Sequence, residues 1–241
     1  MIRNLKALGL ALVAVFAMSA MTASAASATD FFTTANQEPA YLTGSSHDNI
    51  FNIPGGSSFQ CTTSAFDGTG VHGGSTVTVL PTYSGILNET PHTNPKCTAS
   101  LGTVTIDVNH CHYVLTGNTT GSDNGTDATV SIVCGAAGPI KITGPLGCTV
   151  SVPSQTPTSG GVVYDNETNH PGGSAIKVTA TSTGITFTST AACGFVGIPS
   201  HGNNATYVGS VIATGYTDNV NNSTTNLTTI HEGPQVGVSI S

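Results

Sequence analysis

Apolar and polar residues alternate along most of this chain with a period of two. Aliphatic or aromatic residues take every second position and Thr or Ser the positions between, in stretches such as STVTVL, GTVTID and GITFTST. Because successive side chains of a strand point to opposite faces, Val, Ile and Phe should lie on one side of a sheet and hydroxyls on the other. No convincing 3.6-residue period occurs after residue 28, so the pattern predicts strands and not helices.

More than ten strands are expected, separated by clusters of Gly, Asn, Asp and Pro. Hairpin turns are expected around Asn109 and Gly184, and loops at 117–126, 166–173 and 218–234. The strands are predicted at 49–53, 58–66, 75–83, 102–108, 111–116, 127–134, 139–143, 148–152, 161–165, 174–181, 184–189, 205–216 and 235–240.

The first 28 residues have the composition of an export signal. Arg3 and Lys6 precede the apolar run ALGLALVAVFAM, which the small-residue stretch SAMTASAASA follows. This order is typical of a cleavable signal peptide, and cleavage is expected after Ala25 or Ala28; a retained anchor is the alternative. The sequence therefore predicts a secreted or cell-surface protein.

No break in composition and no repeat of fixed period divides residues 29–241. We therefore predict one domain in this range, an all-β antiparallel sandwich of the Greek-key or jelly-roll kind.

Charged residues make up 7% of the chain, against about 25% in ordinary globular proteins. After residue 28 the basic residues are Lys96, Lys141 and Lys177, against twelve acidic residues. Such a chain has no basic surface for phosphates, so nucleic acid and anionic lipid are poor candidate partners. Threonine, with 39 copies, supplies the polar surface instead.

Six cysteines in an exported chain indicate three disulfides. Cys97 and Cys111 are 14 residues apart, as are Cys134 and Cys148, and each interval could close a strand–turn–strand unit. The spacing therefore predicts the bonds Cys97–Cys111 and Cys134–Cys148, which leaves Cys61–Cys193 by elimination.

The tripeptide His110-Cys111-His112 admits two interpretations. On one straight strand the two histidines would share a face and could chelate a metal. However, Asn109 tolerates positive φ, which places His110 in a turn and separates the pair. No further ligands stand at zinc-site spacing, so we predict a disulfide cysteine with two surface histidines and no metal site.

Other combinations of chemical groups are weaker. Ser46-His47-Asp48 has the residue types of a catalytic triad, but such triads are assembled from distant positions. Asp165 and Glu167 could form the carboxylate pair of a glycoside hydrolase, although their surroundings are typical of a loop. The stretch SDNGTD at 122–127 lacks the spaced ligands of an EF-hand. No catalytic residue and no cofactor is therefore predicted.

Blocks such as FQCTTSAFDGTG, STVTVLPTYSG, VNHCHYVLTG and VSIVCGAAGPIKIT, which span most of residues 29–241, carry a family resemblance. The chain resembles a group of exported proteins of unknown function from high-GC Gram-positive soil bacteria. The resemblance implies a secreted, disulfide-containing β-protein. His110 stands where similar sequences tend to have Gly in an Asn-Gly turn, which supports placing it in a turn.

Three functional classes remain open. The first is a non-catalytic structural or binding component outside the cell, with a cell-wall or other extracellular partner and possible self-association. The second is a carbohydrate-binding module, although six Tyr and no Trp leave few rings to stack on sugars. The third is a secreted hydrolase, which would need Asp107, Asp165, Glu167 or a histidine in a deep pocket with a convergent partner.

Overall fold

The computed structural model describes residues 32–34, 40–46, 49–55, 57–70, 73–85, 96–100, 102–117, 129–167, 169, 173–217 and 235–239. The predicted signal peptide at 1–28, the loop at 218–234 and the candidate calcium loop at 122–127 lie outside these residues.

Strands make up most of the described chain, and two short 3₁₀ segments accompany them. The first nine strands are β1 (Thr33–Thr34), β2 (Ala40–Ser46), β3 (Asn49–Ile53), β4 (Ser57–Cys61), β5 (Thr63–Gly70), β6 (Thr76–Ser84), β7 (Cys97–Ala99), β8 (Gly102–Asp107) and β9 (His112–Thr116). The others are β10 (Thr129–Val133), β11 (Ile140–Thr143), β12 (Thr149–Val152), β13 (Ser159–Glu167), β14 (Ala175–Ser189), β15 (His201–Tyr216), β16 (Gln235–Val236) and β17 (Val238–Ser239), with 3₁₀ segments η1 (Pro145–Gly147) and η2 (Ala191–Val196).

Eight of these strands form a closed antiparallel barrel. The hydrogen-bonded order runs β15-β3-β4-β7-β8-β11-β12-β14, and β14 pairs with β15 to complete the ring. The all-β antiparallel class with three disulfides is confirmed. The predicted sandwich of two separate sheets is corrected, because the sheet closes on itself through β14 and β15.

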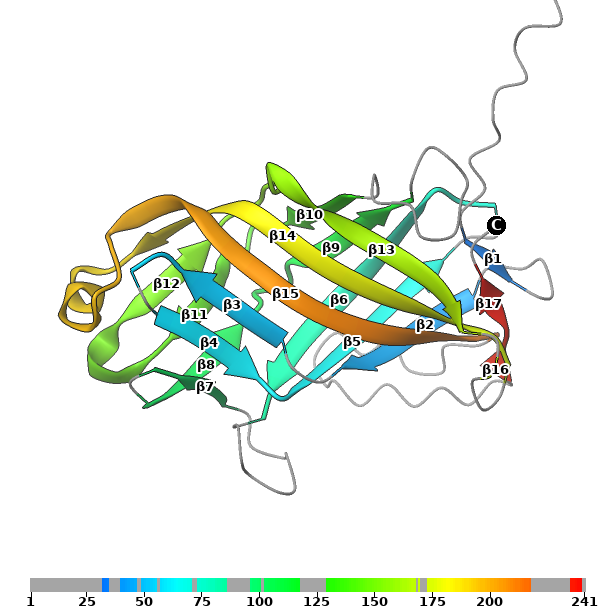
Figure 1. Ribbon diagram of the computed structural model, residues 1–241, viewed down its shortest axis with the longest axis horizontal. Helices are drawn as coiled ribbons and strands as arrows, with labels where there is room; N and C mark the ends of the chain where they lie inside the picture. Colours follow the sequence, from blue (N-terminus) through cyan, green and yellow to red (C-terminus); the bar gives the residue numbers. More distant parts are fainter. Residues whose placement is uncertain are drawn as a thin grey trace, which may run out of the picture.

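Most of the remaining strands extend this sheet beyond the barrel, whereas β1 and β17 form a separate two-stranded sheet. β13 flanks β14, and β2, β5, β6, β9 and β10 continue from β15. The long strands β14 and β15 run along the molecule and belong to both parts (Figure 1). β15 pairs with β3 through 206–208 and with β2 through 212–216. Each long strand therefore changes neighbours part-way along its length.

The two parts have separate apolar cores. Inside the barrel, Phe59, Val104, Ile142, Val150 and Phe187 belong to one buried cluster. A second cluster lies in the extension. It contains Phe32, Ala40, Leu42, Val77, Val79, Val162, Tyr164, Ile176 and Val178. The alternation in the sequence supplies these inward-facing residues, and each large apolar side chain that becomes fully buried stabilises the fold by about 1.5–3 kcal/mol.

Most predicted strands are found close to their expected positions, with several differences; β1 was not predicted, and the range 235–240 is two strands, β16 and β17. The range 58–66 is two strands, β4 and β5, with Thr62 between them. β2 was not predicted because its inward face ends in Gly44 and Ser46 and is therefore only weakly apolar. β7, with three residues, is too short to give a pattern.

The turn predicted at Gly184 is absent, because β14 continues through it. Gly184 has φ +73°, and the register with β15 shifts between Ser182 and Ile185. Glycine here forms a bulge, which bends a strand without ending it. The bulge lies where β14 leaves β13, to which it pairs through Thr183, and approaches β12, to which it pairs at Thr188 and Ser189.

All three predicted cysteine pairings are wrong, although all six cysteines are in disulfides. The bonds are Cys61–Cys97, Cys111–Cys134 and Cys148–Cys193. Thr98 pairs with Gln60 in the sheet, so Cys97 lies across from Cys61. Val133 pairs with His112, which places Cys134 across from Cys111 in the same way.

The equal spacing of 14 residues was misleading for a physical reason. In the hairpin of β7 and β8, Val104 lies across from Cys97, and β8 runs on to Asp107 before the chain turns away. In the hairpin of β11 and β12, Thr143 lies across from Thr149. In each interval, the second cysteine therefore does not lie beside the first, and the two do not form a bond.

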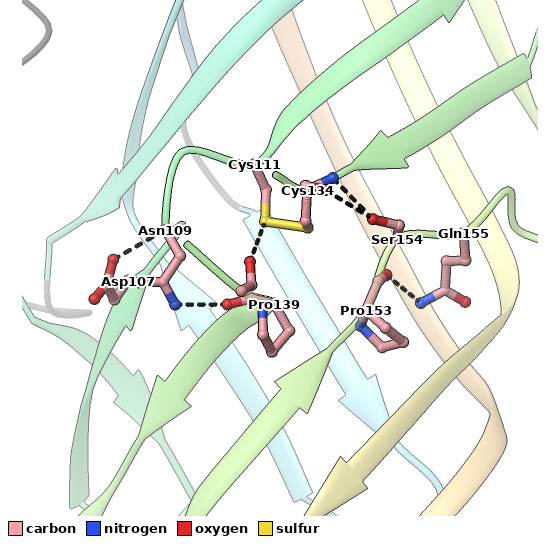
Figure 2. The surroundings of a disulfide bond; sticks show 9 residues. Asp107, Asn109, Cys111, Cys134, Pro139, Pro153, Ser154 and Gln155 are labelled. Carbon is pink, nitrogen blue, oxygen red and sulfur yellow. Dashed lines mark hydrogen bonds between the residues drawn. A yellow bond between two sulfur atoms is a disulfide. The ribbon is translucent and has the colours of Figure 1, made fainter. Parts of the chain in front are cut away.

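The segment between β8 and β9 is a tight turn, as predicted. Asn109 and His110 have φ values of 48° and 57°, and the amide of Cys111 donates to the carbonyl of Val108. Asn109 is held by a bond from its Nδ2 to the carbonyl of Pro139 and from its amide to Asp107 (Figure 2). The flanking strands do not pair with each other, so the turn is not the predicted hairpin; it connects the barrel to the extension.

Replacing His110 with Gly should raise the free energy of unfolding by about 0.5–1 kcal/mol, because Gly adopts positive φ without the steric cost of a Cβ and this gain exceeds its extra unfolded-state entropy. Chemical denaturation would measure the change. His110→Ala is the matched control, since it removes the ring but keeps the Cβ, and it should give no gain. Equal stabilisation by both variants would contradict this explanation.

Candidate ligand-binding cavity

The groups that the sequence suggested for chemistry are not brought together. His110 is exposed in the turn, and His112 begins β9 across from Val133. Cys111 is buried in its disulfide (Figure 2). Within the described ranges, no group of three or more His, Cys, Asp or Glu side chains could hold a metal ion.

The other candidates are also scattered. Ser46 is buried at the end of β2, while His47 and Asp48 lie outside the described residues. Asp165 and Glu167 are on β13, where Asp165 pairs with Lys177 in the register of the sheet. Asp107 binds the backbone of the turn after β8. None of these carboxylates lines the cavity described next.

A cavity of about 140 Å³ lies between the two cores. Its walls include side chains from the barrel cluster, among them Phe59, Ile142 and Ile185, and from the extension cluster, among them Leu42 and Val79. Of the described residues that line it, most are apolar and none carries a charge. It therefore occupies the region where the long strands change neighbours.

Three tyrosines are among the few polar residues at the cavity, with Thr43, Asn49, Ser182 and Ser210. Tyr83 is on β6, Tyr113 on β9 and Tyr207 on β15, and all three line the cavity. The hydroxyl oxygens of Tyr83 and Tyr113 are 2.8 Å apart and share a hydrogen bond. These side chains therefore bring hydroxyls from three strands to one region of the interior.

Asn49, at the start of β3, holds the third hydroxyl in place. The hydroxyl of Tyr207 donates to Asn49 Oδ1 over 2.6 Å. Asn49 Nδ2 donates in turn to the hydroxyls of Ser46, 3.1 Å away, and Ser64, 2.9 Å away. A Cβ at Gly209 would stand 2.7 Å from Asn49 Oδ1, so glycine leaves room for this bond.

Burial raises the pKa of Tyr113 to about 12 and also raises the pKa values of Tyr83 and Tyr207 well above their usual range. The cause is desolvation, which disfavours the charged phenolate. Each of these rings nevertheless keeps some accessible surface. All three residues line the cavity, and all three hydroxyls are neutral at ordinary pH.

Aromatic rings form much of the remaining wall. Phe51 and Phe59 are stacked with centroids 6.2 Å apart, on neighbouring strands β3 and β4. Phe66 meets Tyr83 edge to face at 6.1 Å and Tyr113 at 6.5 Å. Phe51, Phe59 and Phe66 all line the cavity.

Sequence reasoning did not identify these tyrosines as a group. Tyr83, Tyr113 and Tyr207 lie in predicted strands, but no motif connects three strands so far apart in the chain. Position in a strand does not single them out either, because five of the six tyrosines lie in predicted strands.

Searches against protein-family models, curated proteins and solved structures found no match. In the described part of the chain, no helix is long and apolar enough to cross a membrane.

Proposed function

We propose that this chain is an exported, non-catalytic binding protein whose cavity takes up a small apolar molecule. The observation that carries the proposal is the cavity of about 140 Å³ between the two cores, lined by apolar side chains and a few placed hydroxyls. Ligand sites are typically concave and apolar with a small number of polar groups that orient the ligand. Antiparallel barrels of eight strands can enclose one small ligand.

The size of the cavity limits the ligand. An engineered apolar cavity of about 150 Å³ in another protein stays dry and binds benzene, whereas sites for drug-sized ligands measure about 300–1,000 Å³. The present cavity therefore suits a molecule built on a single ring.

Export is supported by the three disulfides, since such bonds persist mainly in oxidising compartments outside the cytosol. The signal-like composition of residues 1–28 agrees with this. A carbohydrate is a poorer ligand for this cavity, because several of its hydroxyls would be buried against apolar walls without partners. A hydrolase is not favoured, because Asp107, Asp165 and Glu167 are outside the cavity lining.

Benzene is expected to bind the purified protein with a stoichiometry of one and to raise its thermal midpoint in a concentration-dependent way. Ala180→Leu adds three carbon atoms at a position that lines the cavity and should abolish this shift. NMR chemical shifts of the cavity residues and thermal melts would measure binding.

Ala191→Leu is the matched control, because Ala191 is exposed in η2 and does not line the cavity. It should leave benzene binding unchanged. Absence of saturable binding in the unmodified protein, or equal loss in both variants, would refute the cavity as a ligand site.

A further inference from the structure

The polar side chains at the cavity include a tyrosine pair and a tyrosine–asparagine network. An apolar interior gains nothing from hydroxyls unless they bond to one another or to a guest. The Tyr207 hydroxyl is committed to Asn49 as a donor, and Asn49 is committed to Ser46 and Ser64. Of the three tyrosines, Tyr83 and Tyr113 have hydroxyls whose bonding capacity the Asn49 network does not use.

The protons of that pair can be counted. Two hydroxyls carry two protons, and the single bond of 2.8 Å between them uses one. If Tyr83 donates to Tyr113, the proton of Tyr113 points away from the pair. If Tyr113 donates to Tyr83, the proton of Tyr83 can go to Tyr207, with which it also interacts, and the oxygen of Tyr113 is left as an acceptor. The pair can therefore present either a donor or an acceptor at Tyr113.

We propose that the cavity selects a small, uncharged aromatic molecule with one hydroxyl group, and that the Tyr83–Tyr113 pair recognises this hydroxyl. A ligand hydroxyl both donates and accepts, so it complements the pair in either proton arrangement, whereas a ketone or an ether complements only one. The inference rests on the proposed function, because it names the class of ligand for the same cavity.

The rest of the lining determines the body and the charge of the ligand. Phe51, Phe59 and Phe66 line the cavity, and aromatic rings pair favourably with an aromatic guest. No charged side chain is present among the described lining residues, so an ionised ligand would be desolvated without a counter-charge. A carboxylate of the same size should therefore be rejected.

The test compares phenol, benzene and benzoate on the full protein by NMR titration. The measured quantity is the ratio of phenol affinity to benzene affinity, which separates the hydroxyl from the ring. In the double variant Tyr83→Phe/Tyr113→Phe this ratio should fall about tenfold, the equivalent of one hydrogen bond, while benzene still binds. Replacing both partners together avoids leaving one buried hydroxyl unpaired.

Tyr164→Phe is the matched control, since Tyr164 is buried in the extension but does not line the cavity; the ratio should not change. The single variant Tyr113→Phe should lower the ratio in the same direction and serves if the double variant is unstable. Benzene binding with an unchanged ratio, or benzoate binding as tightly as phenol, would overturn this inference and leave the proposed function standing. Failure of benzene itself to bind would refute both.

Discussion

Digestion of the unreduced protein at lysine should give two disulfide-linked products of defined composition. Lys96, Lys141 and Lys177 divide residues 29–241 into four peptides. With the bonds Cys61–Cys97 and Cys148–Cys193, the peptide that ends at Lys96 is joined to 97–141, and 142–177 is joined to the C-terminal peptide. Cys111–Cys134 stays within 97–141.

The pairing suggested by spacing would give a different result. Cys134–Cys148 would join 97–141 to 142–177, and Cys61–Cys193 would join the first peptide to the last. Mass spectrometry before and after reduction distinguishes the two patterns directly. A product that joins 97–141 to 142–177 would contradict the structure at two bonds at once.

Reduction should destabilise the protein strongly. The bonds close intervals of 36, 23 and 45 residues, for which the chain-entropy model gives about 3–4 kcal/mol each. Loss of all three would remove an amount comparable with the whole stability of an ordinary domain, about 5–15 kcal/mol. Circular dichroism should show an unfolded chain after reduction at neutral pH. A reduced protein with an unchanged melting temperature would contradict the expectation.

Local structure was predictable where it depends on neighbouring residues. Alternation in GTVTID and GITFTST gave β8 and the end of β14 because each strand has one face in a core. The turn at Asn109 was predictable because Asn adopts positive φ readily. These signals extend over fewer than ten residues, which is the range over which a pattern can be recognised.

Long-range pairing could not be read in the same way. Closure of the barrel depends on β12 meeting β14 at Val150 and Ser189, and no local pattern specifies this partner. Gly184 was read as a turn because a glycine with positive φ serves a bulge as well as a hairpin. The sheet register determines which cysteines pair. The pairs therefore cannot be predicted when the register is unknown.

The candidate site could not be predicted from the sequence for the same reason. Asn49, Tyr83, Tyr113 and Tyr207 stand on four different strands, and their side chains meet only because β15 exchanges β2 for β3 beside them. The scarcity of tyrosine argued against sugar stacking at a surface. In the structure, half of the six tyrosines line the interior cavity, so the few tyrosines are concentrated there.

Raising the pH above about 10 should unfold the protein steeply, because its buried tyrosines resist ionisation. Burial raises the pKa of Tyr113 to about 12, and it also raises the pKa values of Tyr83, Tyr164 and Tyr207 well above their usual range. In the unfolded chain a tyrosine ionises near pH 10. Above that pH the unfolded state binds fewer protons than the folded state, so stability falls as pH rises.

The size of this effect follows from the number of groups. One pH unit above the unfolded pKa, each buried tyrosine contributes a loss of about 1.4 kcal/mol, so four contribute about 5–6 kcal/mol. The stabilisation is complete below about pH 10 and is lost progressively toward pH 12 and beyond. Stopped-flow jumps from neutral pH, with tyrosinate absorbance and circular dichroism recorded together, avoid slow alkaline damage to the disulfides. Both signals should change in one transition.

Single variants test whether the tyrosines cause the transition. Tyr164→Phe and Tyr113→Phe each remove one shifted group, so each should reduce the steepness of the transition by one proton. The two variants test different places, because Tyr164 lies in the extension core and Tyr113 at the cavity. An equal loss of steepness in both would show that tyrosines in both places contribute to the transition. Tyrosinate absorbance from Tyr113 in a chain that is still folded near pH 10 would instead mean that its hydroxyl is open to water, which would also remove the physical basis for a desolvated, neutral cavity.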